Sequence, residues 1–229
     1  MIVMIHALHG KGYPGRQDSV HIDVLERVLK EGHGVTFDDR LVSQRLALPL
    51  LAKYKVRGTF FLNNKNDQAR DKAVMCEMGV DRYFSHFPAP EYPPHYLAEY
   101  KFYSDADKRF RWFRDKNYTE YRKIADRLLG NMEVFLSPEE LTGHELGLHT
   151  YSHPVDLKQL SFDEESSEWI KNLAWLSKYG EIKKAAFPLG RWSIHSMEIL
   201  KSLGIEKMYL AEISALNELI TRKDISRWK

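Results

Sequence analysis

The stretch Val35-Thr36-Phe37-Asp38-Asp39 ends a short apolar run in two adjacent carboxylates, and Gly32 and Gly34 stand just before it. The run predicts a β-strand, and in α/β proteins catalytic side chains gather at the carboxyl ends of the strands. Neighbouring carboxylates repel each other, so a fold that places both at one strand end usually supplies a cation. An isolated Asp-Asp pair is also common in a solvated turn, where Asp caps the following helix.

A second stretch far downstream, His149-Thr150-Tyr151-Ser152-His153-Pro154, favours the cation. A short strand over residues 145–148 is expected to deliver His149 at its end. Because Pro154 disfavours helix at His153, both imidazoles are expected in a strand-end loop. One carboxylate and two imidazoles suit a zinc-like ion that keeps open positions for other ligands.

Composition sets limits on the class of protein. The 229 residues are 43% hydrophobic, and 34 basic residues against 32 acidic ones leave a net charge of +2, so no nucleic-acid footprint is expected. No apolar stretch approaches the ~20 residues that cross a bilayer. Residues 1–9 form a short apolar run with two histidines, unlike a signal peptide, and the single cysteine, Cys76, fits a reducing compartment. We therefore expect a cytoplasmic protein.

Strand-like and helix-like patterns alternate along the chain. Strands are expected at residues 2–8, 33–37, 58–62, 145–148, 184–187 and 207–210, and helices at 20–30, 46–54, 67–78, 162–179 and 196–203. In the 162–179 helix one apolar face is expected to hold Trp169, Ile170, Leu173 and Leu176, and residues 224–229 are expected as an edge segment. This alternation predicts a mainly parallel α/β barrel or sheet.

The alternation stops between residues 83 and 121, where thirteen of the twenty-eight aromatic residues occur. We expect a single domain over residues 1–229 with an aromatic-rich insertion at about 80–131, partly helical from about residue 105. The insertion is either a subdomain with its own small core or a substrate-binding lid. Aromatic side chains interleaved with charges are also what a carbohydrate-binding wall needs.

Three motifs carry a resemblance to a known family. Thr36-Phe37-Asp38-Asp39, followed by Leu48-Pro49-Leu50-Leu51 and Gly58-Thr59-Phe60-Phe61, resembles the first motif block of the polysaccharide deacetylase family, also called the NodB-homology or carbohydrate esterase 4 family. The His149–Pro154 stretch matches its His-Ser/Thr-x-x-His motif, and Phe187-Pro188-Leu189-Gly190 resembles its third motif. The resemblance covers most of the chain outside residues 80–131 and implies a distorted (β/α)7-type barrel.

The resemblance also implies roles for individual residues. Three metal ligands are implied for a divalent ion, with zinc the expected metal: Asp39, His149 and His153. Asp38 becomes the general base, Thr150 braces the histidine loop, and a backbone amide near Leu189 holds the oxyanion. A bound divalent ion activates water and polarises an amide carbonyl, which suits attack on an N-acyl carbon.

The chain departs from the family pattern at three places. Arg40 stands where the family usually has glycine, and Ala186 stands where an arginine often orients the base. Arg191 follows too late to replace that arginine. No Leu-x-His motif near the carboxyl terminus supplies the general acid.

The amino terminus offers a candidate for that acid. Met4-Ile5-His6 resembles the permuted poly-N-acetylglucosamine deacetylase branch, in which the acid histidine ends the first strand. His6 is therefore the expected general acid and His9 the alternative, unless both are simply polar residues at a strand end.

Together these features predict a metal-dependent hydrolase that removes an N-acyl group, with acetyl the expected group, from an amino sugar. A glycan precursor such as a nucleotide sugar, a lipid-linked sugar or a small glycan is the expected substrate. The alternatives are a sugar deformylase of the same fold, a non-catalytic sugar-binding protein on a decayed deacetylase frame, and a structural barrel with solvated Asp and His. The oligomeric state stays open.

Overall fold

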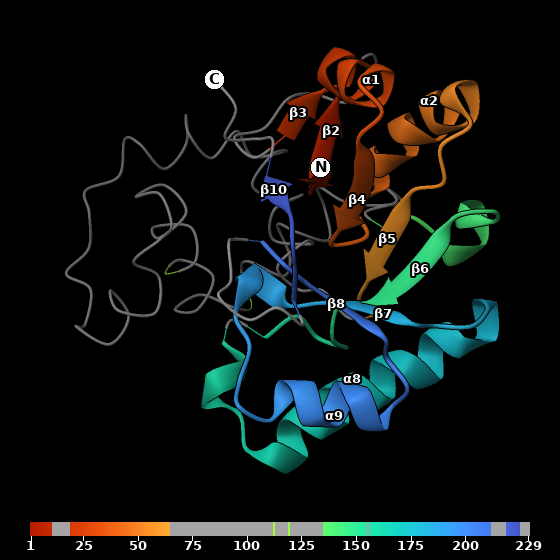
Figure 1. Ribbon diagram of the computed structural model, residues 1–229. Helices are drawn as coiled ribbons and strands as arrows, with labels where there is room; N and C mark the ends of the chain where they lie inside the picture. The colour runs from red at the N-terminus through yellow and green to blue at the C-terminus, as the bar shows by residue number, and fades with distance from the viewer. Residues whose placement is uncertain are drawn as a thin grey trace. The chain divides into compact units, whose positions relative to one another are not determined.

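Figure 1 shows the computed structural model of the chain, which describes residues 1–10, 19–64, 112, 119, 135–154, 156–211 and 219–224. The chain divides into two compact units: Met1–Ala69 with Phe135–Lys229, and Arg70–Val134. The helix expected at 67–78 and nearly all of the insertion expected at 80–131 lie outside the described residues, so their structure and role stay predictions.

The first unit is built on a parallel sheet with the strand order β10-β1-β4-β5-β6-β7-β8-β9. The strands are β1 (Ile2–Ile5), β4 (Gly34–Asp38), β5 (Thr59–Leu62), β6 (Glu145–Leu148), β7 (Lys184–Ala186), β8 (Lys207–Leu210), β9 (Leu219–Thr221) and β10 (Lys223–Asp224). β9 and β10 are two halves of one segment, interrupted at Arg222. Because β9 pairs with β8 and β10 pairs with β1, this segment closes the sheet into a seven-stranded barrel.

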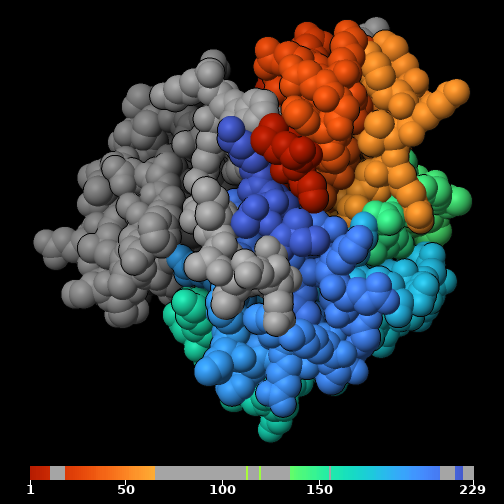
Figure 2. Space-filling model, in the orientation of Figure 1, coloured from red at the N-terminus to blue at the C-terminus, as the bar shows by residue number. Residues whose placement is uncertain are grey.

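The closure is visible on the surface, where the blue carboxyl-terminal segment lies against the red amino-terminal residues (Figure 2). The predicted fold class, a distorted (β/α)7-type barrel, is thereby confirmed.

Helices cover the outside of the barrel. They are α1 (Ile22–Lys30), α2 (Ala47–Tyr54), α8 (Phe162–Leu176) and α9 (Ser196–Ser202), with 3-10 turns η1 (Val42–Leu46), η2 (Pro138–Leu141), η3 (Leu157–Gln159), η4 (Ser177–Tyr179) and η5 (Pro188–Gly190). In Figure 1, α1 and α2 lie beside β4 and β5, and α8 and α9 lie beside β7 and β8. In the ranges that the structure describes, no helix has the length and apolar character needed to span a bilayer.

Each strand sends alternate side chains to the two sides of the sheet. In β5, Phe60 and Leu62 belong to the large core beneath the helices. Between them, Phe61 joins a separate buried cluster with Ala186 and Tyr209, inside the barrel. By the same alternation, the side chain of Asn63, two residues beyond Phe61, is expected to face the interior just past the carboxyl end of β5.

The first strand is shorter than predicted. The expected strand over 2–8 is broken at His6, so that β1 ends at Ile5 and β2 (Ala7–His9) pairs with β3 (Ser19–His21) in a separate two-stranded sheet. Because Val20 belongs to β3, the helix expected at 20–30 begins only at Ile22.

The buried face of α8 differs from the apolar face predicted. Ile170 is 51% exposed, so its placement in the core was wrong. The buried face instead carries Glu165, Trp169, Asn172 and Leu176. The Glu165 Oε1 atom accepts hydrogen bonds from Trp169 Nε1 at 3.2 Å and from Ser196 Oγ at 2.5 Å, and Oε2 accepts one from Ser193 Oγ, so both buried oxygens have donors. Polar residues with buried partners are invisible to a pattern based on hydrophobicity.

Candidate functional site

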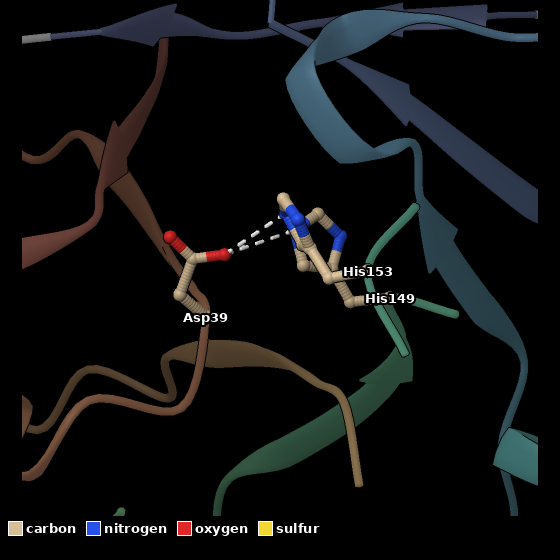
Figure 3. Close-up of side chains that lie close together, drawn as sticks. All are labelled: Asp39, His149 and His153. Carbon is tan, nitrogen blue, oxygen red and sulfur yellow. Dashed lines mark ion pairs between the residues drawn. The ribbon is translucent and has the colours of Figure 1, made fainter. Parts of the chain in front are cut away.

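Three of the side chains singled out in the sequence meet at the carboxyl ends of β4 and β6 (Figure 3). Asp39 Oδ1 lies 3.2 Å from His153 Nε2 and 3.5 Å from His149 Nε2. The candidate ligand atoms of these three buried residues all lie within 4.8 Å of one another. One carboxylate oxygen and two imidazole nitrogens are a ligand set that zinc accepts in open sites, so the residues present fit a divalent ion.

The loop after β6 fixes both imidazoles. His149 Nδ1 lies 2.9 Å from the carbonyl oxygen of Ala186, a position that an N–H donor satisfies, which leaves Nε2 directed at Asp39. Thr150 Oγ1 donates to the His149 carbonyl at 2.6 Å and accepts from the His153 backbone N–H at 3.1 Å. The hydroxyl of Thr150 thus connects the two histidines, as the predicted bracing role requires.

The backbone around these residues is strained. Asp39, Thr150 and His153 have φ angles of 75°, 61° and 57°, in the left-handed region that non-glycine residues seldom adopt. Each such residue costs on the order of 1–3 kcal/mol, and such costs are found mainly where a fold positions a functional group.

Electrostatics in the cluster favour a positive charge. Burial lowers the pKa of His149, but the carboxylates of Asp38 and Asp39 outweigh it, so that the pKa lies above the ordinary histidine value. Two buried carboxylates facing the imidazoles therefore create a place where a cation is stabilised.

Asp38, the predicted base, is held by an arginine that sequence reasoning missed. Arg222 Nη1 donates to Asp38 Oδ1 at 2.5 Å and Nη2 donates to Oδ2 at 2.8 Å, a bidentate pair. Arg222 Nη1 also donates to Thr36 Oγ1 at 3.1 Å. Burial raises the pKa of Asp38, but Arg222, His149 and His6 outweigh it and hold the pKa below the usual aspartate value. The carboxylate is therefore ionised.

Arg222 reaches Asp38 from the strand segment that closes the barrel. It lies between β9 and β10, and its guanidinium carbon lies 5.1 Å from the centre of the Phe61 ring and 5.9 Å from that of Tyr209. Both rings belong to the interior cluster that includes Ala186, where the family often carries an arginine. Arg191, rejected above as a replacement, pairs instead with Asp156 at 3.5 Å. The only sequence signal for Arg222 is its position two residues after Ile220 in a strand that was not recognised.

His6 lies close enough to Asp38 to lower the pKa of its carboxyl group. Gln44 ties the two strand ends together, because its Nε2 donates to the backbone carbonyl of His6 at 2.8 Å and also to that of Asp38. The break between β1 and β2 falls at His6, which places this histidine at the carboxyl end of β1.

His9, the alternative acid, belongs to the two-stranded sheet. Its Nδ1 lies 2.8 Å from Ser19 Oγ, and its ring centre lies 5.1 Å from that of His21. The geometry therefore favours His6 over His9, while the role of His6 as a general acid stays a prediction.

Arg40, the departure from the usual glycine, has a structural basis. Its φ of 55° lies in the region that glycine enters at no steric cost. The guanidinium carbon lies 4.5 Å from the centre of the Phe135 ring and 5.1 Å from that of Trp175. Cation–π attraction in these contacts offsets the cost of the positive φ angle. Burial lowers the pKa of Arg40 to about 10, with Tyr179 opposing the shift.

The third motif forms η5 after β7. Leu189 has a φ of 54° and a side chain that is 46% exposed. The expected use of a backbone amide near Leu189 to hold an oxyanion stays a prediction.

Solved structures of deacetylases share this fold. The Streptococcus pyogenes deacetylase PplD in complex with acetate matches with 17% sequence identity and a TM-score of 0.56 over 96% of this chain and 89% of that one. IcaB from Ammonifex degensii matches with 15% identity and a TM-score of 0.56, over 96% and 90% of the two chains. BC0361, a polysaccharide deacetylase from Bacillus cereus, matches with 14% identity and a TM-score of 0.55, but the chain covers only 63% of it.

No protein-family model and no curated protein matches the sequence. At these identities the structural likeness shows the fold alone. The resemblance predicted from the motifs is therefore confirmed at the level of the fold.

Proposed function

We propose that the protein is a metal-dependent carbohydrate N-deacetylase that hydrolyses the N-acetyl group of an amino sugar or glycan precursor. The observation that carries the proposal is the convergence of Asp39, His149 and His153 beside a second buried carboxylate, Asp38, which is held by Arg222. The fold shared with solved deacetylases supports the same reading.

Asp39, His149 and His153 would hold the divalent ion, which supplies Lewis acidity that acidifies water and polarises an amide carbonyl. Asp38 is the adjacent acceptor for the proton of the attacking water. Its two oxygens offer about four acceptor positions, and Arg222 occupies one on each oxygen, so acceptor positions remain. Arg222 also keeps Asp38 ionised and fixes its orientation. Because it lowers the pKa of Asp38, it makes this carboxylate a weaker base.

His6 is the proposed donor to the leaving nitrogen. The water oxygen bonds to the acyl carbon as Asp38 takes a proton, and the carbon–nitrogen bond breaks as His6 gives its proton to nitrogen. The products are acetic acid and a free amine, which ionise in water to acetate and an ammonium group, and transfer of the proton from Asp38 to His6 restores both catalytic groups. The place of His6 directly after β1, joined to Asp38 through the Gln44 side chain, supports this assignment.

Two alternatives use the same site. A deformylase would carry out the same water attack on a smaller acyl group. A non-catalytic sugar-binding protein was favoured by the missing arginine and by Arg40. Arg222 supplies Asp38 with an arginine partner from another strand, and Arg40 packs against aromatic rings. Neither departure from the family pattern therefore indicates a loss of catalytic activity.

The proposal is tested by measuring acetate and formate release from defined probes. The purified protein is incubated with one equivalent of zinc and with N-acetylglucosamine oligomers, a nucleotide-linked N-acetylglucosamine and their N-formyl analogues. The nucleotide sugar belongs in the set because the cytoplasmic location, still a prediction, would give access to such precursors.

The expected result is acetate release that stops on chelation and returns with zinc. Formate release alone would support the deformylase. Sugar binding by calorimetry without any acyl release would contradict hydrolysis and support the binding protein.

A further inference from the structure

Asn63 is a buried amide that the fold does not use. It follows β5 directly, and its side chain is 0% exposed. In the described part of the chain, neither its Oδ1 nor its Nδ2 has a hydrogen-bond partner. Burying a carboxamide without partners costs free energy, and native folds contain few such groups, so the site needs an explanation.

The strand register places Asn63 beside His149. In the parallel pair β5 and β6, Phe61 is opposite Gly147 and Leu62 is opposite Leu148, so the next residues, Asn63 and His149, follow side by side.

Asn172 of α8 holds these two strand ends together. Its Nδ2 donates to the Leu62 carbonyl at 3.0 Å, and its Oδ1 accepts from the His149 backbone N–H at 2.9 Å. The placement of Asn63 next to a candidate metal ligand is thus fixed by the backbone.

β5 ends at Leu62, and its alternation continued by one residue directs the Asn63 side chain into the barrel. Phe61, two residues earlier, belongs to the interior cluster, and Leu62 belongs to the outer core. The amide therefore lies on the interior side of the sheet, at the carboxyl end where Asp38 and His149 also lie.

Gln44 provides a contrast at the same end of the barrel. It is equally buried, but its Nε2 donates to the carbonyls of His6 and Asp38 and so joins β1 to β4. Gln44 and Asn172 both have evident structural duties, whereas Asn63 has none among the described contacts. A buried polar group that does nothing for the fold, next to a candidate reaction centre, is best explained by a ligand.

We propose that Asn63 contacts the substrate, its amide forming hydrogen bonds with a polar group of the N-acylated sugar beside the scissile amide. This inference rests on the proposed function. Nδ2 donates and Oδ1 accepts, so the amide fits a group that can do both, such as a sugar hydroxyl or the acyl amide itself. A substrate that satisfies Asn63 removes the unpaired buried group, and an analogue without the partner group leaves it unpaired, which gives selectivity.

The test replaces Asn63 by leucine, which has a similar size and no polar atoms, and uses Asn172→Leu as the matched control. In the metal-free protein, Asn63→Leu should leave the melting temperature unchanged or raise it, because no hydrogen bond is lost. Asn172→Leu should lower it, because the Leu62 carbonyl and the His149 N–H both lose a partner. With zinc and an N-acetylglucosamine oligomer, Asn63→Leu should reduce kcat/KM at least ~10-fold while one zinc still binds.

Two results would overturn the proposed role of Asn63 and leave the proposed function standing. One is a fall in melting temperature as large as that of Asn172→Leu, which would make the amide structural. The other is a kcat/KM for Asn63→Leu that equals that of an active wild-type protein. No turnover by the wild-type protein on any N-acylated probe would instead overturn the proposed function, and this inference with it.

Discussion

Replacing Arg222 by methionine would remove the guanidinium while keeping an unbranched side chain inside the barrel. The change leaves the Asp38 carboxylate, 2% exposed, without its bidentate partner, and removes a donor to Thr36 Oγ1. Breaking a buried ion pair by removing one partner costs about 3–5 kcal/mol, because the remaining charge is buried and uncompensated. Since 1 kcal/mol shifts the melting temperature of a domain this size by about 2–4 °C, the expected decrease is about 6–20 °C.

The assay is thermal and urea unfolding of the metal-free protein at pH 7. Arg45→Met is the matched control, because Arg45 Nε and Nη2 form a bidentate pair with Glu140 at 2.6 and 2.8 Å, but those side chains are 35% and 31% exposed. A pair of that exposure is expected to contribute no more than about 1 kcal/mol. The double variant Asp38→Asn with Arg222→Met should recover part of the loss, since neither charge remains.

The difference in stability between the wild-type protein and Arg222→Met should depend on pH in a defined direction. Arg222 holds the folded-state pKa of Asp38 below its unfolded value. The stability from this pair is therefore present above the unfolded aspartate pKa and is lost as the pH falls through the lowered folded pKa. The gap between wild type and Arg222→Met should be largest at neutral pH and should shrink in acid. An effect no larger than that of Arg45→Met, or one that is constant with pH, would refute the buried pair.

Three further substitutions test the remaining parts of the site and barrel. Asp38→Asn should keep one zinc per chain and lower kcat by about 10²–10⁴, because it removes the proton acceptor; full activity would exclude Asp38 from the mechanism. His6→Ala should lower kcat with zinc content unchanged while His9→Ala leaves kcat near wild type, and the reverse pattern would make His9 the acid. Gly147→Ala would place a Cβ 2.5 Å from an aromatic ring of β5, so we expect a loss of about 1–3 kcal/mol by urea unfolding. Gly34→Ala, whose Cβ meets nothing closer than 3.7 Å, should have little effect, and equal losses would contradict this packing.

Most of the strands and helices could be predicted because they alternate along the chain with clear apolar periodicity, whereas the barrel was implied by the family resemblance. The closing segment could not be predicted, because β9 and β10 are short and are interrupted by the charged Arg222. A charge in such a segment indicates solvent exposure unless its partner is known, and Asp38 lies 184 residues away in sequence. The arginine that holds the predicted base was missed for the same reason.

The metal ligands were predicted from the resemblance of the motifs to a known family, and the structure brings their three side chains together. What the motifs could not give is the geometry between them, which depends on positive φ angles at Asp39, Thr150 and His153. The importance of Asn63 was equally hidden, since it emerges only from its burial and from the register of β5 against β6. Hydrophobic patterns identify elements, whereas buried polar partners depend on the assembled fold.

Anomalous diffraction from a crystal soaked with zinc at neutral pH tests the metal site on which the proposed chemistry depends. We predict one strong peak, at ~2.0–2.2 Å from a carboxylate oxygen of Asp39 and from Nε2 of His149 and His153. His153→Ala should greatly weaken the peak. No peak at these three residues, or zinc bound only elsewhere, would contradict the account.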